Sequence, residues 1–160
     1  MSEADGTAGE APTNPVSTGR LSFAIFSMAR AHRAYAAELL RELDLHPGQE
    51  LLLMQLMERD GQTQAELLAS VGLDHSTVSK SLKRMQERGL VEREPTEHDR
   101  RAMRVRLTPK GEGMRGPLER MWATLERTSV RDLDERGIEQ FIATSETIKR
   151  AILERHAAES

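Results

Sequence analysis

The feature that most constrains the fold is the stretch from Asp74 to Lys110, where a helical pattern gives way to two strand patterns. Val78, Leu82 and Met85 follow i, i+4, i+7 spacing, which places them on one buried face of a helix. Gly89 then predicts the end of this helix, because glycine is the preferred residue just after a helix C-terminus. The opposite face is left with short hydroxyl side chains and cations.

A hairpin pattern follows this helix. Residues 90–91 begin one strand, and in residues 103–107 apolar side chains alternate with arginines, as in a half-buried strand. The segment between them, residues 94–101, is too polar to bury. The expected fold is therefore mainly α with a small β wing: a winged helix-turn-helix.

The helix-turn-helix is completed by the residues before Asp74. Thr63 and Glu66 have the spacing of a capping box, which predicts a short helix starting there. Gly72 suits the turn that follows, since it adopts positive φ without steric cost, and Asp74 suits the cap of the second helix. We assign the helix-turn-helix to residues 63–88.

Long helical patterns flank this lobe. A helix over about 22–43 carries an apolar stripe, and a shorter one over about 48–59, with Pro47 suited to its first turn, is apolar nearly all round. On the far side, Thr108 and Pro109 restart a helix that we expect to kink near Pro117.

Asp134 caps a last helix that again has an apolar stripe. The first and last helices have more apolar surface than one small domain requires, which favours a twofold dimer. The expected organisation is a mobile tail over 1–19, N- and C-terminal dimerisation helices over 20–46 and 109–157, and a DNA-binding lobe over 47–108.

The charge distribution points to a nucleic-acid partner. The chain of 160 residues has a formal net charge of −3, yet residues 76–110 hold ten Lys and Arg against five Asp and Glu. This local balance of +5 leaves −8 to the remainder, so a basic stripe lies on an acidic body. A merely solvated charged face is the alternative interpretation.

Two groups of residues are the candidate DNA contacts. On the second helix we expect major-groove and phosphate contacts, at least half of them to the DNA backbone, from His75, Ser76, Thr77, Ser79, Lys80, Lys83 and Arg84. For Lys80 and Arg84 both guanine edges and phosphates are open as targets, and support of the helix cap is the alternative role of His75. On the wing, Arg101 is the expected minor-groove residue, held by Asp99, with Arg93 and Arg100 near phosphates.

The order and spacing of five motifs give the stretch from about Leu21 to Arg155 a resemblance to the MarR/SlyA-type transcriptional regulators. The motifs are TQAEL from Thr63, DHSTVSK from Asp74, ERGLV from Glu87, DRR from Asp99 and VRLTPKG from Val105. The resemblance implies a homodimer clasped by its terminal helices, with recognition helices in successive major grooves and wings over the minor groove. It also supports the pairing of Asp99 with Arg101.

The family resemblance further implies a small-molecule effector held between the dimerisation helices and the DNA-binding lobe. The residues that would border such a crevice are Ile25, Met28, His32, Leu52, Gln55 and Met114. Ordinary core packing is the favoured interpretation of the same residues. The leading hypothesis is a homodimeric repressor of a nearby promoter, bound at a pseudo-palindromic operator of double-stranded DNA and released by a small phenolic or other apolar ligand.

Other classes of function find little support in the sequence. No nucleophile elbow or phosphate loop is present, so an enzyme is not expected, and no cofactor is implied. The five histidines form no close cluster with Glu, and cysteine is absent, so no metal site is expected. No export signal or membrane span is visible, which favours the cytoplasm. The alternative hypothesis is a winged-helix protein-interaction module that does not bind DNA.

Overall fold

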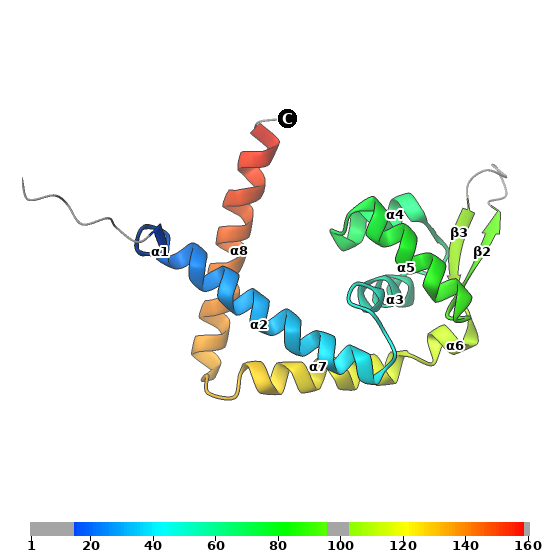
Figure 1. The fold of residues 1–160 in the computed structure, drawn as a ribbon, viewed down its shortest axis with the longest axis horizontal. Coiled ribbons are helices and arrows are strands. Elements are labelled where there is room, and N and C mark those ends of the chain that lie inside the picture. Colours follow the sequence, from blue (N-terminus) through cyan, green and yellow to red (C-terminus); the bar gives the residue numbers. More distant parts are fainter. Residues whose placement is uncertain (1–14, 96–102, 159–160) are drawn as a thin grey trace, which may run out of the picture. The chain divides into compact units, whose positions relative to one another are not determined.

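The computed structural model describes residues 15–95 and 103–158. The chain divides into two compact units, residues 1–35 and residues 36–160, which we describe separately. The elements, in chain order (Figure 1), are α1 (Pro15–Thr18), α2 (Arg20–Glu42), α3 (Gln49–Glu58), β1 (Gln62–Thr63), α4 (Gln64–Val71), α5 (His75–Glu87), β2 (Val91–Pro95), β3 (Met103–Leu107), α6 (Pro109–Glu112), α7 (Arg115–Ser129) and α8 (Glu135–Ala158). The fold is mainly helical with one small antiparallel sheet, as the sequence predicted.

The first unit holds α1 and most of α2. The four-residue helix α1 lies in the segment expected to be a tail, while residues 1–14 of that segment lie outside the described residues. The α2 residues of this unit expose large apolar side chains, among them Phe23 and Phe26, which are 50% and 58% exposed. Within the part of the chain that the structure describes, no helix is long and apolar enough to cross a bilayer.

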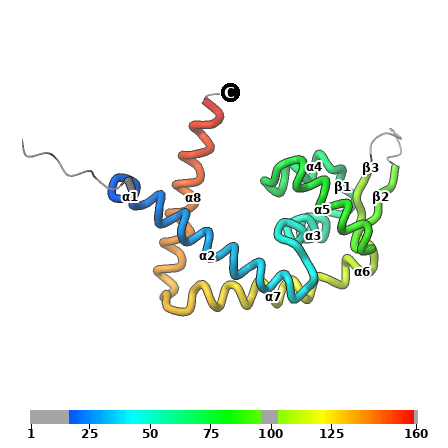
Figure 2. The backbone as a smooth tube through the Cα atoms, in the orientation of Figure 1, coloured from blue at the N-terminus to red at the C-terminus, as the bar shows by residue number. Residues whose placement is uncertain are grey.

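The second unit, whose backbone can be followed in Figure 2, is built around one hydrophobic core. It receives side chains from the last turns of α2, from α3, α4 and α5, from β2 and β3, and from α7. The fully or nearly fully buried members include Leu40, Leu52, Leu53, Leu56, Leu67, Val78, Leu82, Met85, Val105, Leu118 and Met121. Burial of this many aliphatic side chains is what holds the small lobe together.

The sheet has the strand order β1-β3-β2, and both pairings are antiparallel. Residues 91–95 of β2 pair with residues 107–103 of β3, and β1 adds the pairs Gln62 with Val105 and Thr63 with Arg104. The sequence pattern predicted β2 and β3 but missed β1. It also ended β2 too early, because Glu94 and Pro95 belong to the strand and not to the tip.

The helix ends follow the expected capping chemistry. Thr63 and Glu66 form the predicted capping box, Gly72 has a φ of 65°, and Gly89 has a φ of 69° just after α5. Thr108 accepts a hydrogen bond from the backbone N–H of Gly111 at 3.1 Å and so caps α6.

Two helix predictions need correction. The helix after Thr108 is interrupted at Gly113 and Met114, three to four residues before the expected kink at Pro117, because the glycines there end α6 before proline has any effect. Pro47 does not lie in the first turn of α3, since Gly48 with a φ of 96° is the cap and the helix begins at Gln49.

Candidate nucleic-acid interface

Helix α5 presents two chemically different faces. Its inner face buries Val78, Leu82 and Met85, each with 0% exposure, and Ser81 with 8%. These side chains fix the helix on the core, so the outer face is held in a defined orientation. Such a rigid backing is what a helix needs in order to place side chains against a surface with precision.

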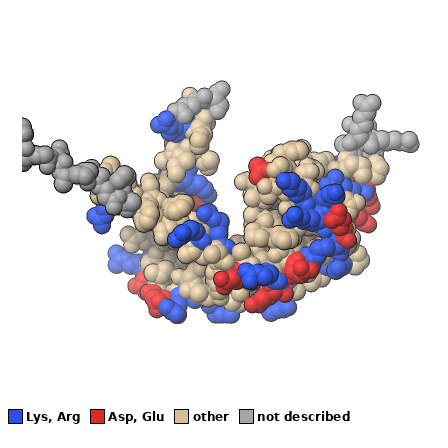
Figure 3. Space-filling model, viewed as in Figure 1, with Lys and Arg blue, Asp and Glu red and all other residues tan. Residues whose placement is uncertain are grey.

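The outer face carries the residues that the sequence analysis singled out. His75, Ser76, Lys80, Lys83 and Arg84 are exposed, whereas Thr77 and Ser79 are half-buried. Figure 3 shows Lys and Arg side chains gathered over the part of the lobe where α5 and β2 lie. Lys83 has a loose ion pair with Glu87 at 4.0 Å, one helical turn away. An exposed pair of this kind contributes little and leaves the ammonium accessible.

The start of α5 is organised by one carboxylate. Asp74 Oδ1 accepts hydrogen bonds from the backbone N–H of Thr77 and from the Ser76 hydroxyl, both at 2.9 Å. Its Oδ2 accepts from the Thr77 hydroxyl at 2.5 Å. The Thr77 hydroxyl and amide and the Ser76 hydroxyl together hold the pKa of the Asp74 carboxyl well below its usual range. Two of the three hydroxyls of the predicted set, those of Ser76 and Thr77, therefore act first as part of the cap.

The two arginines of β3 are held by polar contacts with neighbouring residues. Arg106 Nε lies 2.7 Å from Glu94 Oε2, and an Nη of the same side chain lies 3.7 Å from Asp60. Arg104 donates to the carbonyl oxygen of Gly61 at 2.6 Å. Both exposed arginines of β3, Arg104 and Arg106, are thus engaged with neighbours in the lobe.

Arg93 differs from the other arginines of the sheet. It is half-buried and stands opposite Val105 in the strand register, on the face of the sheet that meets the core. Its Nε is buried without a hydrogen-bond partner. The predicted contact of Arg93 with a phosphate remains a prediction. Asp99, Arg100 and Arg101, the predicted residues of the wing tip, lie outside the described residues.

The six residues of the expected crevice fall in both compact units. Ile25, Met28 and His32 are exposed residues of the first unit. In the second unit, Leu52 is 0% exposed and belongs to the core, as the packing interpretation expected, while Gln55 and Met114 are half-buried. The crevice itself remains a prediction.

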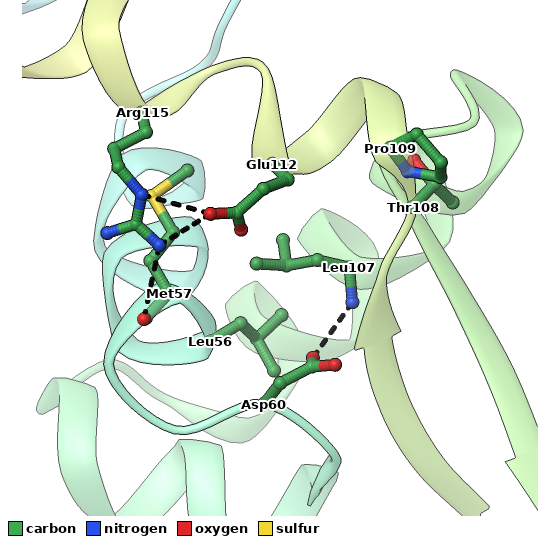
Figure 4. A pocket seen from close by; sticks show the side chains of 8 residues that line it. All are labelled: Leu56, Met57, Asp60, Leu107, Thr108, Pro109, Glu112 and Arg115. Atoms are coloured by element: carbon green, nitrogen blue, oxygen red, sulfur yellow. Dashed lines mark hydrogen bonds and ion pairs between the residues drawn. The ribbon is translucent and has the colours of Figure 1, made fainter.

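A hollow of about 440 Å³ lies where the end of α3 meets β3 and α6 (Figure 4). Its apolar wall includes Leu56 and Leu107, and its polar groups are bound to one another or to the backbone. Arg115 pairs with Glu112 at 2.6 Å, and Asp60 accepts from the backbone N–H of Leu107 at 2.9 Å. We interpret the contacts around this hollow as structural: they attach α6 and α7 to the winged lobe.

The sequence analysis missed the role of one residue at the C-terminal end of α5. Arg88, the C-cap of α5, appeared in the sequence only as part of the helix end, yet its side chain reaches Asp44 in the loop after α2. Because 44 residues separate the two, no periodic pattern could have predicted this contact. The Ser76 and Thr77 contacts with Asp74 were predictable in principle, since serine and threonine follow the capping aspartate within one turn.

Comparison with known proteins identifies similar chains. Residues 43–102 match the family model described as MarR family. The chain is 34% identical over 118 residues to the HTH-type transcriptional regulator TtmR of Methylorubrum extorquens (strain PA1), a match that covers 73% of this chain and 60% of TtmR. The chain therefore spans less than two thirds of the length of this curated relative.

Two solved structures illustrate the similarity of the fold. A MarR transcriptional regulator from Methanosarcina mazei Go1 has a TM-score of 0.74 at 24% identity, covering 85% of this chain and 98% of that one. A MarR family regulator from Listeria monocytogenes, solved in complex with a 26mer DNA, has a TM-score of 0.71 at 21% identity, covering 82% and 87%.

Proposed function

Because residues 43–102 match the family model described as MarR family, we propose that the chain belongs to that family and is a sequence-specific, double-stranded DNA-binding transcriptional regulator. In this proposal a homodimer represses a nearby promoter from a pseudo-palindromic operator. Helix α5 of each copy lies in a major groove. The relatives named above carry the names of transcriptional regulators. We propose the same role for this chain, without an enzymatic activity and with a location in the cytoplasm.

The observation that carries the proposal is the division of α5 into a fully buried face and an exposed cationic face. Lys80, Lys83 and Arg84 project from a helix whose inner apolar side chains, Val78, Leu82 and Met85, have 0% exposure. Cations on a fixed helix can neutralise phosphates and release counterions, which supplies a large share of the affinity of such proteins for DNA. The DNA bound by the Listeria protein supports the same role for this lobe.

The base contacts would come from the start of α5. His75, Ser76, Thr77 and Ser79 lie in its first two turns, where helix-turn-helix proteins contact base edges. Ser76 and Thr77 keep their oxygen lone pairs available while they donate to Asp74. We propose that Lys80, Lys83 and Arg84 contact phosphates, and that Arg93, Asp99, Arg100 and Arg101 form the wing contacts expected from the sequence.

The homodimer would cover apolar side chains that a single chain leaves exposed. On α8, Phe141, Ile142, Ile152 and Leu153 are 49–58% exposed, and no residue of this helix is buried. On the first part of α2, Leu21, Phe23, Phe26 and Met28 are 45–61% exposed. Exposed apolar surface on this scale marks an interface in a water-soluble protein. The proposed dimerisation segments are 20–46 and 109–157.

A small apolar or phenolic effector completes the proposal. Such a ligand would release DNA only if it bound the DNA-incompatible form of the dimer more tightly than the DNA-binding form. In the incompatible form, the distance between the two lobes would not match two consecutive major grooves. The residues expected to border its site are those predicted for the crevice, Ile25, Met28, His32, Leu52, Gln55 and Met114.

Fluorescence anisotropy with DNA from upstream of the chain's own gene tests the proposal. The upstream duplex and a scrambled duplex are titrated at two salt concentrations. We expect selective binding to the upstream duplex, with an affinity that falls steeply as salt rises. Binding that is absent from both duplexes at low salt would contradict the proposal and favour the protein-interaction module.

The variant Arg101→Ala is measured on the same two duplexes. If Arg101 lies in the minor groove, affinity for the upstream duplex falls and the preference over the scrambled duplex narrows. Unchanged affinity in this variant would remove Arg101 from the interface without affecting the role of α5.

A further inference from the structure

The C-terminal end of α5 is held at the point where the chain enters the winged lobe. The Arg88 side chain donates a hydrogen bond to the carbonyl oxygen of Asp44, and its other terminal nitrogen lies 2.8 Å from the Asp44 carboxylate. Asp44 lies in the loop between α2 and α3. Its backbone N–H donates to the carbonyl oxygen of Arg41 at 3.0 Å, and Leu45 N–H donates to that of Leu40 at 2.9 Å. The loop is therefore fixed to the last turn of α2.

The same end of α5 is also held where the chain leaves the lobe. The carbonyl oxygen of Arg88 accepts from Lys110 Nζ at 2.8 Å, and that of Gly89 accepts from the Thr108 hydroxyl at 2.6 Å. Thr108 and Lys110 belong to the start of α6. Both connections between the winged lobe and the rest of the chain thus meet at residues 88–89.

The backbone of Asp44 indicates why an acid occupies this position. Its φ of 56° makes it the one residue other than glycine with positive φ among residues 15–95 and 103–158. Glycine would adopt this conformation at lower cost, although aspartate tolerates it better than most residues. What aspartate adds is the carboxylate that Arg88 binds. The Arg88 side chain is only 29% exposed, whereas that of Asp44 is 87% exposed.

We propose that Arg88 is a positioning residue which, through Asp44, fixes the angle of α5 relative to the last turn of α2, and so determines which spacing of operator half-sites the dimer accepts. An arginine that binds a carboxylate and a carbonyl at once restrains orientation as well as distance. A dimer contacts two half-sites about one helical turn apart. If α5 could change its angle, the dimer would also bind operators in which the distance between the half-sites is altered. The inference rests on the proposed function.

The test compares four proteins on three duplexes. The proteins are the wild type, Arg88→Ala, Asp44→Asn and the double variant. The duplexes are the upstream operator and two derivatives in which one base pair is inserted or deleted between the half-sites. Circular dichroism confirms that each variant retains its helices. Asparagine also tolerates positive φ, so Asp44→Asn removes the charge of the carboxylate while preserving the backbone.

We expect the wild type to prefer the natural spacing. Arg88→Ala should reduce that preference by about three- to tenfold, the scale at which a contact that couples two elements acts. Asp44→Asn should reduce it by a smaller factor, because the contact of Arg88 with the Asp44 carbonyl remains. The double variant should match Arg88→Ala, since both changes remove the same interaction. Arg59→Ala, which removes a cation whose side chain is 61% exposed at the end of α3, should leave the preference unchanged.

Asp44→Asn separates positioning from direct DNA contact. If Arg88 merely contacted a phosphate, Arg88→Ala would weaken all three duplexes equally and lower the salt slope by about 1. Asp44→Asn would then strengthen binding, because it removes a negative charge. That pair of results would overturn the inference, as would a lowered melting temperature with an unchanged spacing preference.

Failure of the proposed function is recognised separately. A wild-type protein that does not prefer its upstream duplex over a scrambled one contradicts the regulator proposal before any variant is compared. A wild type that binds selectively but equally well at all three spacings contradicts only the role of Arg88.

Discussion

Helices α5 and α8 have the same amphipathic periodicity but different environments in the single chain. In α5, 13 residues long, the apolar positions Val78, Leu82 and Met85 are completely buried. In α8, 24 residues long, no residue is buried, and Phe141 and Ile142 are 49% and 55% exposed. The apolar face of α5 is satisfied within one chain, whereas that of α8 requires a partner. This difference in burial distinguishes residues that stabilise the fold of the lobe from residues that we propose stabilise the dimer.

The largest expected effect is on the core beneath α5. Leu82→Ala should lower the free energy of unfolding by about 2–5 kcal/mol, because it removes buried methyl groups and leaves a cavity. Chemical denaturation checks this at several protein concentrations. Leu153→Ala, on the 58%-exposed side chain of α8, is the comparison, and its loss of stability should appear only at concentrations at which the dimer forms. An equal loss in both variants would break the distinction between the two helices.

The next effect concerns the face of α8. Phe141→Ala should raise the dissociation constant of the homodimer by about a hundredfold or more, since a buried aromatic side chain contributes about 1.5–3 kcal/mol and a twofold interface loses two of them. Analytical ultracentrifugation measures the constant, with the exposed polar neighbour Glu139→Ala as control. A dissociation constant that Phe141→Ala does not change would exclude this face from the interface.

A smaller effect is expected from the cations of α5. Lys80→Ala should weaken binding to the upstream and scrambled duplexes by similar factors and lower the salt slope by about 1. Lys149→Ala is the matched control on α8, where Lys149 pairs with Glu146 at 2.6 Å. If Lys149→Ala lowered the slope as much as Lys80→Ala, the assignment of DNA binding to α5 would be wrong.

The smallest effect concerns the cap of α5 and depends on pH. Because the folded-state pKa of Asp74 is depressed, its ionised form stabilises the fold above the unfolded value of about 4, and this contribution is lost as pH falls through the folded-state pKa. Asp74→Ala should therefore melt below the wild type at neutral pH, with a gap that narrows in acid. Asp74→Asn keeps a hydrogen-bond acceptor for the cap, so its melting temperature should lie between those of the wild type and Asp74→Ala. A difference in melting temperature that does not change with pH would contradict a role for the ionised carboxylate.

The sequence was sufficient for the features that depend on neighbours in the chain. The capping box at Thr63, the cap at Asp74, the buried stripe of α5 and the alternation in β3 were all predicted and are present. Each rests on local spacing, which periodicity detects directly. The family model that matches residues 43–102 covers the first three of these features and ends just before β3.

Features that depend on distant contacts were not accessible in this way. Strand β1 has two residues, too few for an alternation, and exists because Gln62 and Thr63 pair with β3. The bridge between Arg88 and Asp44 joins residues that share no pattern. The break after α6 was misplaced because Pro117 is tolerated within the first turn of α7, while Gly113 ends the preceding helix. The DNA contacts of the candidate site remain predictions, because burial and exposure alone do not identify them.

The most direct test of the central claim is native mass spectrometry of the full chain, alone and with its upstream duplex. We expect the free protein at the mass of two chains, and the complex at the mass of two chains on one duplex. This result would show that the chain forms a homodimer and that the homodimer binds the upstream duplex, the two properties that the account assigns to the faces of α8 and α5. A free protein at the mass of one chain, or a spectrum in which the upstream duplex carries no protein while the dimer persists, would contradict the account.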